Sequence, residues 1–529
     1  MGMRATLAIG LLLAASLGFV PPIERDTSHT VRALLAVAAI GLAWSWPALA
    51  LRFGPDLRRA ALGGLCILGM ANYWQFDRSV AMGPGDVTDV TYYYLNAKYF
   101  DELGYDQLYN AMLVADDGVA TSHITQIRNL ATDELESRDV AEAHGQVHVA
   151  RAFTPERWHA FEHDVRFFLR RLSKRALAEN FFVDHGYNPP LPWAVAGASI
   201  ASWVPVESLG WATYIDVALL AGAFALVGRA YGVDIALWAV LFFATTFSGR
   251  WPILGQSLLR FDWSAALLAA MAASRLGRPA MSGSLLAFAA MTRAFPALFA
   301  FPWLVAGLRA IGRDRHQLRV GWATLGGAVA TVTALGVVSL VWWGADAMWA
   351  SVDALALHAR SFSSQRIGLG TVVLWRGETT REALRAVGGM AEREQDYLDV
   401  LPYLRVLGLG IVVWLGAVMA RRGRPPEDDA ALMVIPFFAA TVAQANYYNL
   451  RLVPVVWHAS RLDERLHRGL LALLFAVEVV AHTAQVSGLD RHATNALSSW
   501  GILLWCVAVG ASLVMTPLEP PPTGASGPR

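Results

Sequence analysis

A pair of aspartates stands at the start of an aromatic stretch in the first quarter of the chain. Asp86 and Asp89 are separated by two residues, and the tyrosine run 92–94 follows them. A carboxyl group that aromatic rings shield from water has a raised pKa and can serve as a general base. The alternative is that Asp89 caps the start of a helix, where a carboxylate is favoured. The two carboxylates could also bind a divalent cation through their oxygens.

An arginine lies between two apolar segments later in the chain. Arg293 and Pro296 separate the segments 280–292 and 296–311, and no carboxylate is near them in the sequence. A guanidinium group in such a place can clamp a phosphate through two parallel hydrogen bonds. A side chain that only extends to a membrane surface would explain Arg293 equally well.

A second charged site precedes the apolar segment 261–275. Gly255 and Gln256 are followed by Arg260 and Asp262. Charges at the edge of an apolar segment cost free energy unless they are paired or functional. A ligand-binding role and simple pairing with neighbours explain Arg260 and Asp262 equally well.

Three further polar motifs lie between apolar segments. They are His185-Gly186-Tyr187-Asn188-Pro189-Pro190, Ser363-Ser364-Gln365-Arg366 and Gln444-Ala445-Asn446-Tyr447-Tyr448-Asn449. The paired prolines suit the first turn of a helix, because the backbone N–H groups that they lack would be unpaired there anyway. The other two motifs are also compatible with ordinary loops.

The composition indicates which solvent surrounds the elements that carry these residues. Of 529 residues, 55% are hydrophobic and only 16% are charged, with a mean hydropathy of +0.40. Soluble domains carry about 25% charged residues. The net charge of +1 gives no argument for nucleic acid as a partner. Cys66 and Cys506 both lie in apolar runs, which excludes a disulfide scaffold and a cysteine metal site.

The hydrophobic residues form blocks long enough to cross a bilayer, which takes about 20 residues. The blocks are 5–20, 31–51, 60–75, 188–205, 209–228, 233–248, 261–275, 280–292, 296–311, 318–343, 401–420, 430–446, 449–460, 469–487 and 496–516. We interpret Ala5–Val20 as an uncleaved first helix. The predicted fold is an all-α polytopic membrane protein with about 12–15 hydrophobic segments.

Arginine clusters between the blocks indicate which loops are cytoplasmic. Counting from either end of the chain gives orientations that differ by one crossing between residues 188 and 275. We therefore expect one irregular or re-entrant piece, and Gly249–Phe261, with Pro252 and Gly255 inside it, is our choice. Irregular backbone is tolerated at membrane depth only where it lines a cavity or is buried in protein.

Six parts of the chain follow from this arrangement. We predict N-terminal transmembrane helices over 1–75, an extracytoplasmic domain with the acidic motif over 76–187, a transmembrane core over 188–343, a second extracytoplasmic loop over 344–400, C-terminal transmembrane helices over 401–516 and a disordered cytoplasmic tail over 517–529. In the first outer domain, the spacing of apolar residues over Pro155–Phe182 predicts an amphipathic helix along the membrane face.

The order of these motifs resembles the integral-membrane GT-C glycosyltransferases, and most closely glycosyltransferase family 87, whose members use polyprenyl-phosphate sugars. That family opens with an aspartate, two variable residues and a tyrosine, followed by a glycine and a tyrosine, as Asp89, Tyr92, Gly104 and Tyr109 do here. Its next helix starts with Tyr-Pro-Pro, matched by Tyr187-Asn188-Pro189-Pro190 with one residue inserted.

The resemblance continues in the second half and covers roughly residues 60–460. A Gly-Gln motif before a later helix matches Gly255-Gln256, and a basic residue before a proline in a broken hairpin matches Arg293, although lysine is commoner there. Polar and aromatic outer turns are approximated by Ser364-Gln365 and Tyr447-Tyr448. The first outer domain is longer than is typical of the family, and two apolar segments precede the usual first helix.

The composition, rich in arginine, alanine and glycine, is typical of a bacterial protein of high-GC coding, so we expect the cytoplasmic membrane. The resemblance implies a reaction in which a sugar passes with inversion from a polyprenyl-phosphate donor to an acceptor hydroxyl on the outer face of that membrane. Asp89 would be the general base, with Asp86 as the substitute, and Arg293, Arg260 and Arg366 would bind the phosphate. The implied substrate-binding residues are Tyr92, Tyr93, Tyr187, Asn188, Gln256, Asp262, Gln365, Tyr447 and Tyr448. The family does not require a cofactor or metal. The acceptor is a lipid, a glycan or a protein.

Other functions fit parts of the same pattern. A transporter or flippase would account for many spans and an arginine within the membrane, but not for the large acidic outer domain. A polymerase or ligase of polyprenyl-linked sugars carries its large outer loop late in the chain, whereas the loop is early here. A related protein that only binds the lipid-linked sugar is a further alternative.

Overall fold

The computed structural model describes residues 23–83, 85–363, 365–380, 383 and 389–515. These residues are mostly helical, which confirms the prediction of an α-helical fold, and their strands form two short antiparallel pairs. The pairs are β1 (Gln126–Arg128) with β2 (Leu135–Ser137), and β3 (Arg366–Gly368) with β4 (Val442–Gln444). The predicted helix Ala5–Val20 and the predicted disordered tail 517–529 lie outside the described residues.

Among the described residues, six helical segments are long and apolar enough to cross a membrane, judged by length and composition. They are α2 (Arg25–Tyr73), Val206–Tyr231, which ends in α12 (Tyr214–Tyr231), α17 (Arg315–His358), Glu392–Arg422 within α20 (Gly389–Arg422), α24 (Arg465–Val486) and α25 (Arg491–Met515). Shorter apolar helices are α13 (Val233–Thr245) and the segment Phe295–Ala310, formed by η4 (Phe295–Ala300) and α16 (Phe301–Ala310).

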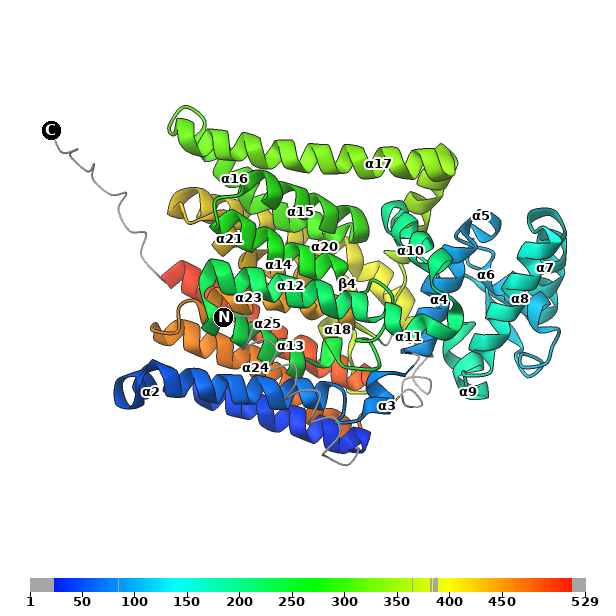
Figure 1. Ribbon diagram of the computed structural model, residues 1–529, viewed down its shortest axis with the longest axis horizontal. Helices are drawn as coiled ribbons and strands as arrows, with labels where there is room; N and C mark the ends of the chain where they lie inside the picture. The colour runs from blue at the N-terminus through cyan, green and yellow to red at the C-terminus, as the bar shows by residue number, and fades with distance from the viewer. Residues whose placement is uncertain (1–22, 84, 364, 381–382, 384–388, 516–529) are drawn as a thin grey trace.

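These helices run side by side as a bundle, with α2 along one edge and α17 along the opposite edge (Figure 1). Two glycines bend the longest helices. Gly54 and Gly344 both have a φ of 81°, a value that favours glycine because it has no Cβ. Gly54 divides α2 into two arms that contain the predicted segments 31–51 and 60–75. Gly344 lies at the predicted boundary between core and second loop, but α17 continues through it to His358.

A smaller helical domain caps one end of the bundle, and we call residues 78–190 the end domain. Its helices are α3 (Arg78–Ala81), α4 (Val87–Lys98), α5 (Phe100–Leu103), α6 (Leu108–Asp116), α7 (Arg138–Ala152), α8 (Pro155–Leu169), α9 (Lys174–Ala176) and η1 (Leu177–Phe181). Its apolar core, which includes Tyr94, Tyr99 and Phe161, continues beyond the domain to Trp193 and Leu258. α10 (Leu191–Trp203) leads from it back to the bundle (Figure 1).

The amphipathic helix in the end domain is shorter than predicted. Thr154 caps the N-terminus of α8 by accepting a hydrogen bond from the N–H of Arg157 at 3.3 Å, but α8 ends at Leu169 and not at Phe182. Its apolar face packs inside the domain, where the Phe161 ring lies 5.0 Å from that of Tyr99. The prediction of a helix along a membrane face was therefore wrong, because the rings of Tyr94 and Tyr99 pack against that face.

The segment predicted to be irregular contains no regular helix between Arg250 and Phe261. It joins η3 (Phe247–Gly249) to α14 (Asp262–Arg275) through turns and bends, and nearly all its side chains are buried. The prediction of irregular backbone buried in protein is confirmed here. The remaining elements are α11 (Leu209–Ala212), η2 (Val206–Ser208), α15 (Pro279–Arg293), α18 (Leu369–Leu374), α21 (Pro426–Asp429), η5 (Ala430–Met433), α22 (Val434–Ala440), η6 (Ala445–Arg451) and α23 (Leu452–Ala459).

Candidate functional site

The two aspartates of the acidic motif open α4, at the junction of the end domain and the bundle. Asp86 occupies the N-cap position and makes no side-chain capping bond, whereas Asp89 lies in the first turn of the helix. The Asp89 carboxylate bonds to two distant side chains instead. One oxygen accepts from the guanidinium of Arg260 and the other from the hydroxyl of Ser257. The capping interpretation of Asp89 is therefore wrong, since its carboxylate binds tertiary partners.

The acidic motif also contacts the Gly-Gln motif through the backbone. The N–H of Asp86 donates to the carbonyl oxygen of Gln256 at 2.8 Å, and the Gln256 amide donates to Gly83 O at 2.8 Å. Gly85 has a φ of +92°, and a Cβ there would lie 2.9 Å from the same Gln256 oxygen. Asp86 Oδ2 accepts from the N–H of Leu254 at 3.2 Å. Two motifs about 170 residues apart thus form one structural unit.

Arg260 is held from two sides. Asp216 of α12 accepts from the backbone N–H groups of Arg260, at 2.5 Å, and of Phe261, at 3.0 Å. At the other end of the side chain, Nη1 donates to the hydroxyl of Tyr93 at 2.9 Å and Nη2 pairs with Asp89. The Arg260 side chain is 8% exposed and that of Asp89 is 14% exposed. Removing one partner of such a buried ion pair strongly destabilises the folded protein, because the other charge is left buried without a partner.

The protonation of Asp89 reflects this burial. Loss of contact with water raises the pKa of Asp89 to about 6, against the opposing effect of Arg260. Asp86 raises the Asp89 pKa further, and Ser257 and Arg293 lower it. A carboxyl group with a pKa of about 6 is a stronger base than an ordinary aspartate and is still mostly ionised at neutral pH.

Arg293 lies at the end of α15, close to the Tyr93 ring. Its guanidinium lies 5.7 Å from the centre of that ring and 5.2 Å from the Trp193 ring. It donates to the backbone oxygens of Leu259 and Thr292, both at 3.0 Å. Because Arg260 bonds to the hydroxyl of Tyr93, this tyrosine connects the two arginines.

A cavity of about 250 Å³ opens beside Arg293, where the bundle meets the end domain. Its lining consists of Asn188, Pro189, Pro190, Arg293, Ala294, Phe295, Leu355, His358, Ala359, Arg366, Tyr397, Leu401, Arg405, Phe437, Ala440, Thr441, Val442, Ala443, Gln444 and Tyr447. Three of these side chains are arginines, and among the described residues none of the lining side chains is acidic. The cavity therefore combines apolar walls with an unbalanced positive charge, which suits an anion that carries an apolar chain.

The second arginine, Arg366, is fixed by the β3–β4 pair. Its guanidinium donates to Val442 O at 3.1 Å, to the Ser361 hydroxyl at 2.6 Å and to His358 Nε2 at 3.3 Å. Only 3% of Arg366 is exposed. Arg405 of α20, by contrast, lies at an exposed position of the cavity wall. The cavity lining thus has one exposed and two buried arginines.

The other predicted binding residues fall into two groups. Asn188 and Tyr447 line the cavity, and the Tyr447 ring lies 5.0 Å from that of Phe295. Tyr92 and Tyr448 do not line it: the Tyr92 ring stacks on Phe181 in the end domain. Tyr93, Tyr187, Gln256, Asp262 and Gln365 do not line it either.

Three of these predicted residues have defined environments. Asp262 begins α14, is 3% exposed, and has one carboxylate oxygen without a hydrogen-bond partner among the described residues. Gln365 accepts from Arg491 at 3.4 Å. Tyr448 is fully buried and its ring packs against Phe437 at 5.7 Å.

Sequence reasoning did not find several residues of the site. Ser257 and Asp216 hold the Asp89–Arg260 pair, and Arg405 and His358 line the cavity. Arg405 could have been singled out from the sequence, because it is a charged residue within the apolar segment 401–420. Nothing in the sequence indicates Ser257 or His358, because their place in the site depends on tertiary contacts.

The described residues contain no group of three or more His, Cys, Asp or Glu side chains that could hold a metal ion. Comparison of the chain with protein-family models, with curated proteins and with solved structures finds no match.

Proposed function

We propose that this chain is a membrane glycosyltransferase that transfers a sugar, mannose or a similar hexose, from a polyprenyl phosphate to an acceptor hydroxyl. The observation that carries the proposal is the arginine-lined, apolar cavity, whose Arg293 is connected through Tyr93 to the Asp89–Arg260 pair. Such a cavity suits a lipid phosphate, and the Asp89 carboxylate suits proton transfer from an acceptor.

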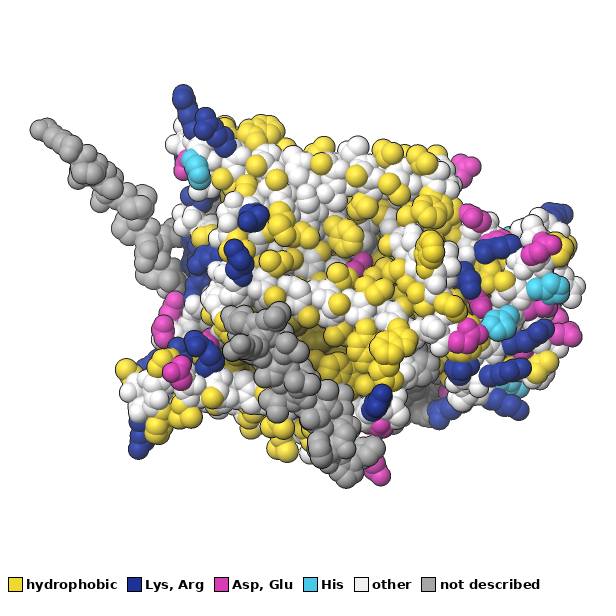
Figure 2. Space-filling view, in the orientation of Figure 1, with side chains coloured by type: hydrophobic (Ala, Val, Ile, Leu, Met, Phe, Trp, Pro, Cys, Tyr) yellow, Lys and Arg dark blue, Asp and Glu magenta, His cyan; other side chains and the backbone are white. Residues whose placement is uncertain are grey.

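The surface of the bundle supports the membrane part of the proposal. Hydrophobic and uncharged side chains dominate it, and charged side chains gather toward its two ends (Figure 2). Only 11% of the apolar window of α17 and 22% of that of α20 are buried inside the protein. Exposed apolar surface of this extent marks an interaction surface, and we assign it to the lipid of a bacterial cytoplasmic membrane.

The arginine clusters support the orientation. They occupy the turns opposite the end domain, with the turn at Gly54 in α2 and the turn between α16 and α17 among them. Because cytoplasmic loops carry an excess of arginine, we place the end domain and the cavity on the outer face.

In the proposed reaction the donor phosphate binds to Arg293 and Arg366, and its polyprenyl chain leaves the cavity toward the lipid. The acceptor oxygen attacks the anomeric carbon as the bond between that carbon and the phosphate oxygen breaks. The phosphate departs with the bonding electrons, and the arginines stabilise its growing negative charge. Inversion at the anomeric carbon follows from this single displacement.

Asp89 takes the proton of the acceptor hydroxyl in this proposal. Its carboxylate is paired with Arg260 in the free protein, and Arg260 is connected to Arg293 through Tyr93. A phosphate bound at Arg293 also attracts the nearby positive charge of Arg260. Donor binding therefore weakens the Asp89–Arg260 ion pair and frees the Asp89 carboxylate to act as a base. The donor thereby prepares the base for the acceptor.

The test is sugar transfer in proteoliposomes from radiolabelled polyprenyl-phosphate mannose to a total extract of membrane lipids and glycans. We expect transfer by the wild type, loss of transfer with retained donor binding in Asp89→Asn, and weakened donor binding in Arg293→Ala. The exposed residues Asp101 and Arg360 provide matched controls as Asp101→Asn and Arg360→Ala.

Donor binding without transfer by the wild type would favour a transporter or a binding protein. Unchanged transfer by Asp89→Asn would show that Asp89 is not the general base, and Asp86 would become the next candidate.

A further inference from the structure

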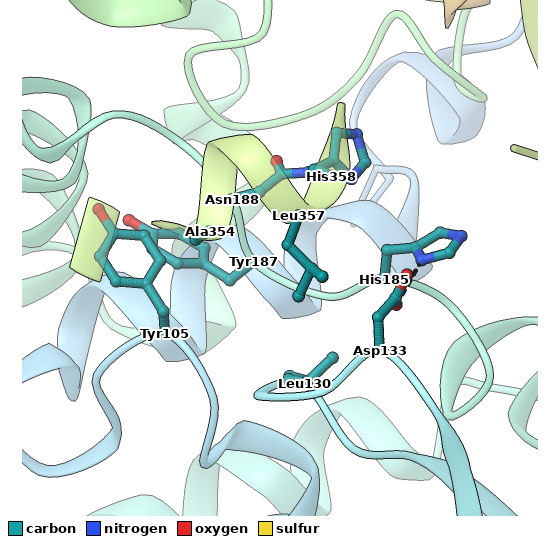
Figure 3. Close-up of a pocket in the computed structure, with 9 residues that line it drawn as sticks. All are labelled: Tyr105, Leu130, Asp133, His185, Tyr187, Asn188, Ala354, Leu357 and His358. Atoms are coloured by element: carbon teal, nitrogen blue, oxygen red, sulfur yellow. Dashed lines mark hydrogen bonds and ion pairs between the residues drawn. The ribbon is translucent and has the colours of Figure 1, made fainter. Parts of the chain in front are cut away.

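One edge of the end domain contacts the bundle at the C-terminal end of α17. A small cavity of about 20 Å³ lies there, and Asp133 and His185 of the end domain line it together with Leu357 and His358 of α17 (Figure 3). His185 Nδ1 lies 2.7 Å from Asp133 Oδ1. The part of the domain around α9 lies at the opposite edge, away from α17 (Figure 1).

A run of cations occupies this opposite edge, and we call residues 166–175 the basic run. It extends from the last turn of α8 into α9 and contains no acidic residue. Its five cations, all at exposed positions, are Arg166, Arg170, Arg171, Lys174 and Arg175. The end domain as a whole has 17 acidic and 11 basic residues, so the basic run reverses its charge locally. Lys and Arg side chains gather on this part of the domain in Figure 2.

Carboxylates of the same domain balance this charge only in part. Among the residues that the structure describes, two of the five cations form ion pairs. Arg166 lies 3.7 Å from Glu162, and Arg175 lies 3.0 Å from Glu179. Exposed pairs of this kind are weak, so the basic run keeps an excess of positive charge that can attract an anion.

The packing of α8 directs the basic run back toward the bundle. α4 begins at the junction with the bundle, and α8 runs antiparallel to it. Arg157, in the first turn of α8, donates to Lys98 O at the far end of α4, at 2.9 Å. The ring of Phe168, in the last turn of α8, lies 5.8 Å from that of Tyr94. The end of α8 therefore returns to the side of the domain that faces the bundle.

Two contacts place this end of α8 beside the start of an apolar segment. The Tyr94 hydroxyl donates to Val204 O at 2.9 Å, and His163 Nε2 of α8 lies 3.4 Å from Glu207. The helical segment Val206–Tyr231, which is long and apolar enough to cross a membrane, begins at this point. The basic run therefore lies close to the level at which this segment would leave the bilayer.

Two tryptophans mark the same level. Trp203 is 87% exposed and Trp211 is 66% exposed, on either side of η2. Exposed tryptophans are enriched where a membrane protein crosses the boundary between lipid and water. The headgroups of the outer leaflet would thus surround the protein next to the basic run.

We propose that the basic run binds the anionic headgroups of phospholipids in the outer leaflet and holds this edge of the end domain on the membrane surface. A cluster of four to eight cations near a bilayer attracts anionic lipid. The cations make this contact, whereas the apolar face of α8 packs inside the domain. Membrane orientation does not require these cations, because large outer domains cross the membrane regardless of their charge. The inference rests on the membrane placement in the proposed function and not on sugar transfer.

The lysines of the chain provide the test, because there are two, and Lys98 is paired with Asp164 at 2.7 Å. The full chain is placed in nanodiscs of phosphatidylcholine alone or with about one third phosphatidylglycerol, and is treated with a water-soluble amine-acylating reagent. Mass spectrometry measures the acylation rate of Lys174. We expect this rate to fall about threefold or more in the discs with phosphatidylglycerol and to recover at high salt, which screens the attraction.

Two variants separate headgroup binding from a general effect of the charged bilayer. Arg151→Lys places a lysine at an exposed position of α7, which lies at the end of the molecule away from the bundle (Figure 1). Acylation of that lysine should be equal in both kinds of disc. Arg170→Gln combined with Arg171→Gln removes two cations close to Lys174, and should restore much of its acylation rate in the discs with phosphatidylglycerol.

Three results would overturn this inference and leave the glycosyltransferase standing. They are equal acylation of Lys174 in both kinds of disc, an equal decrease at the lysine of Arg151→Lys, and an undiminished decrease in the Arg170→Gln, Arg171→Gln double variant. A chain that enters discs of neither composition would overturn the membrane placement on which both proposals rest.

Discussion

Arg260, in the irregular segment before α14, and Asp89, in the first turn of α4, form a buried ion pair across 171 positions of the sequence. The pair ties the end domain to the bundle, and Tyr93 connects it to Arg293 in the lining of the arginine-lined cavity. The pair fixes α4 on the bundle and holds a carboxylate whose pKa is raised.

The ion pair predicts a coupled effect on stability. Asp89→Asn or Arg260→Gln alone leaves one buried charge without its partner, so each is expected to lower the free energy of unfolding by about 3–5 kcal/mol. The double variant leaves two neutral groups and is expected to lose clearly less than the sum of the two. Thermal unfolding of the detergent-solubilised protein measures all three changes. Additive losses would contradict the pairing.

The raised pKa of Asp89 predicts an unusual pH profile of transfer. Since burial raises its pKa to about 6, the fraction of free enzyme with an ionised base grows with pH through about 6. We therefore expect kcat/KM to rise through that range and to be flat above it. An inflection near pH 4 would mean that Asp89 is not the base, and Asp101→Asn serves as the control.

The elements were easier to predict from the sequence than the site. From residue 31 onward, most predicted apolar segments overlap a described helix, because a hydrophobic block determines the element locally. The predicted segment 430–446 is instead divided among η5, α22, β4 and η6. The unit formed by Asp86 and Gln256 joins two motifs that the sequence singles out, but its hydrogen bonds depend on tertiary packing. The same holds for the Asp133–His185 pair, whose partners are 52 positions apart.

The tyrosine run after Asp89 shows where local spacing is insufficient. Tyr92 and Tyr93 follow Asp89 by three and four residues, so both lie on its side of the helix. The Tyr92 hydroxyl donates to Phe181 O inside the end domain, whereas the Tyr93 hydroxyl accepts from Arg260. Only the packing of α4 between the end domain and the bundle decides which tyrosine reaches the site.

The exposed cation of the cavity predicts a modest effect on donor affinity. Arg405 lies at an exposed position of the wall, so its attraction for a phosphate is screened by water and is worth at most about 1 kcal/mol. We expect Arg405→Ala to weaken binding of radiolabelled polyprenyl-phosphate mannose about threefold to fivefold at low salt and less at high salt. Arg360→Ala, at an exposed position outside the cavity lining, should leave binding unchanged. Equal losses in both variants would remove Arg405 from the donor site.

The close packing of α15 on α17 predicts a difference between two adjacent glycines. A Cβ at Gly327 of α17 would lie 2.0 Å from the backbone oxygen of Ala280 in α15, whereas a Cβ at Gly326 has open space around it. Small residues let helices approach closely where no water separates them. Gly327→Ala must therefore push the helices apart, at a cost of about 1–3 kcal/mol. α15 ends at Arg293, so the shift also moves the proposed phosphate clamp.

The matched variant Gly326→Ala should keep wild-type stability or gain slightly, because alanine favours a helix. Unfolding midpoints and donor binding, measured for both variants in the same detergent, test the pair. If Gly327→Ala were as stable as Gly326→Ala and bound donor equally well, the close contact between Gly327 of α17 and Ala280 of α15 would be contradicted.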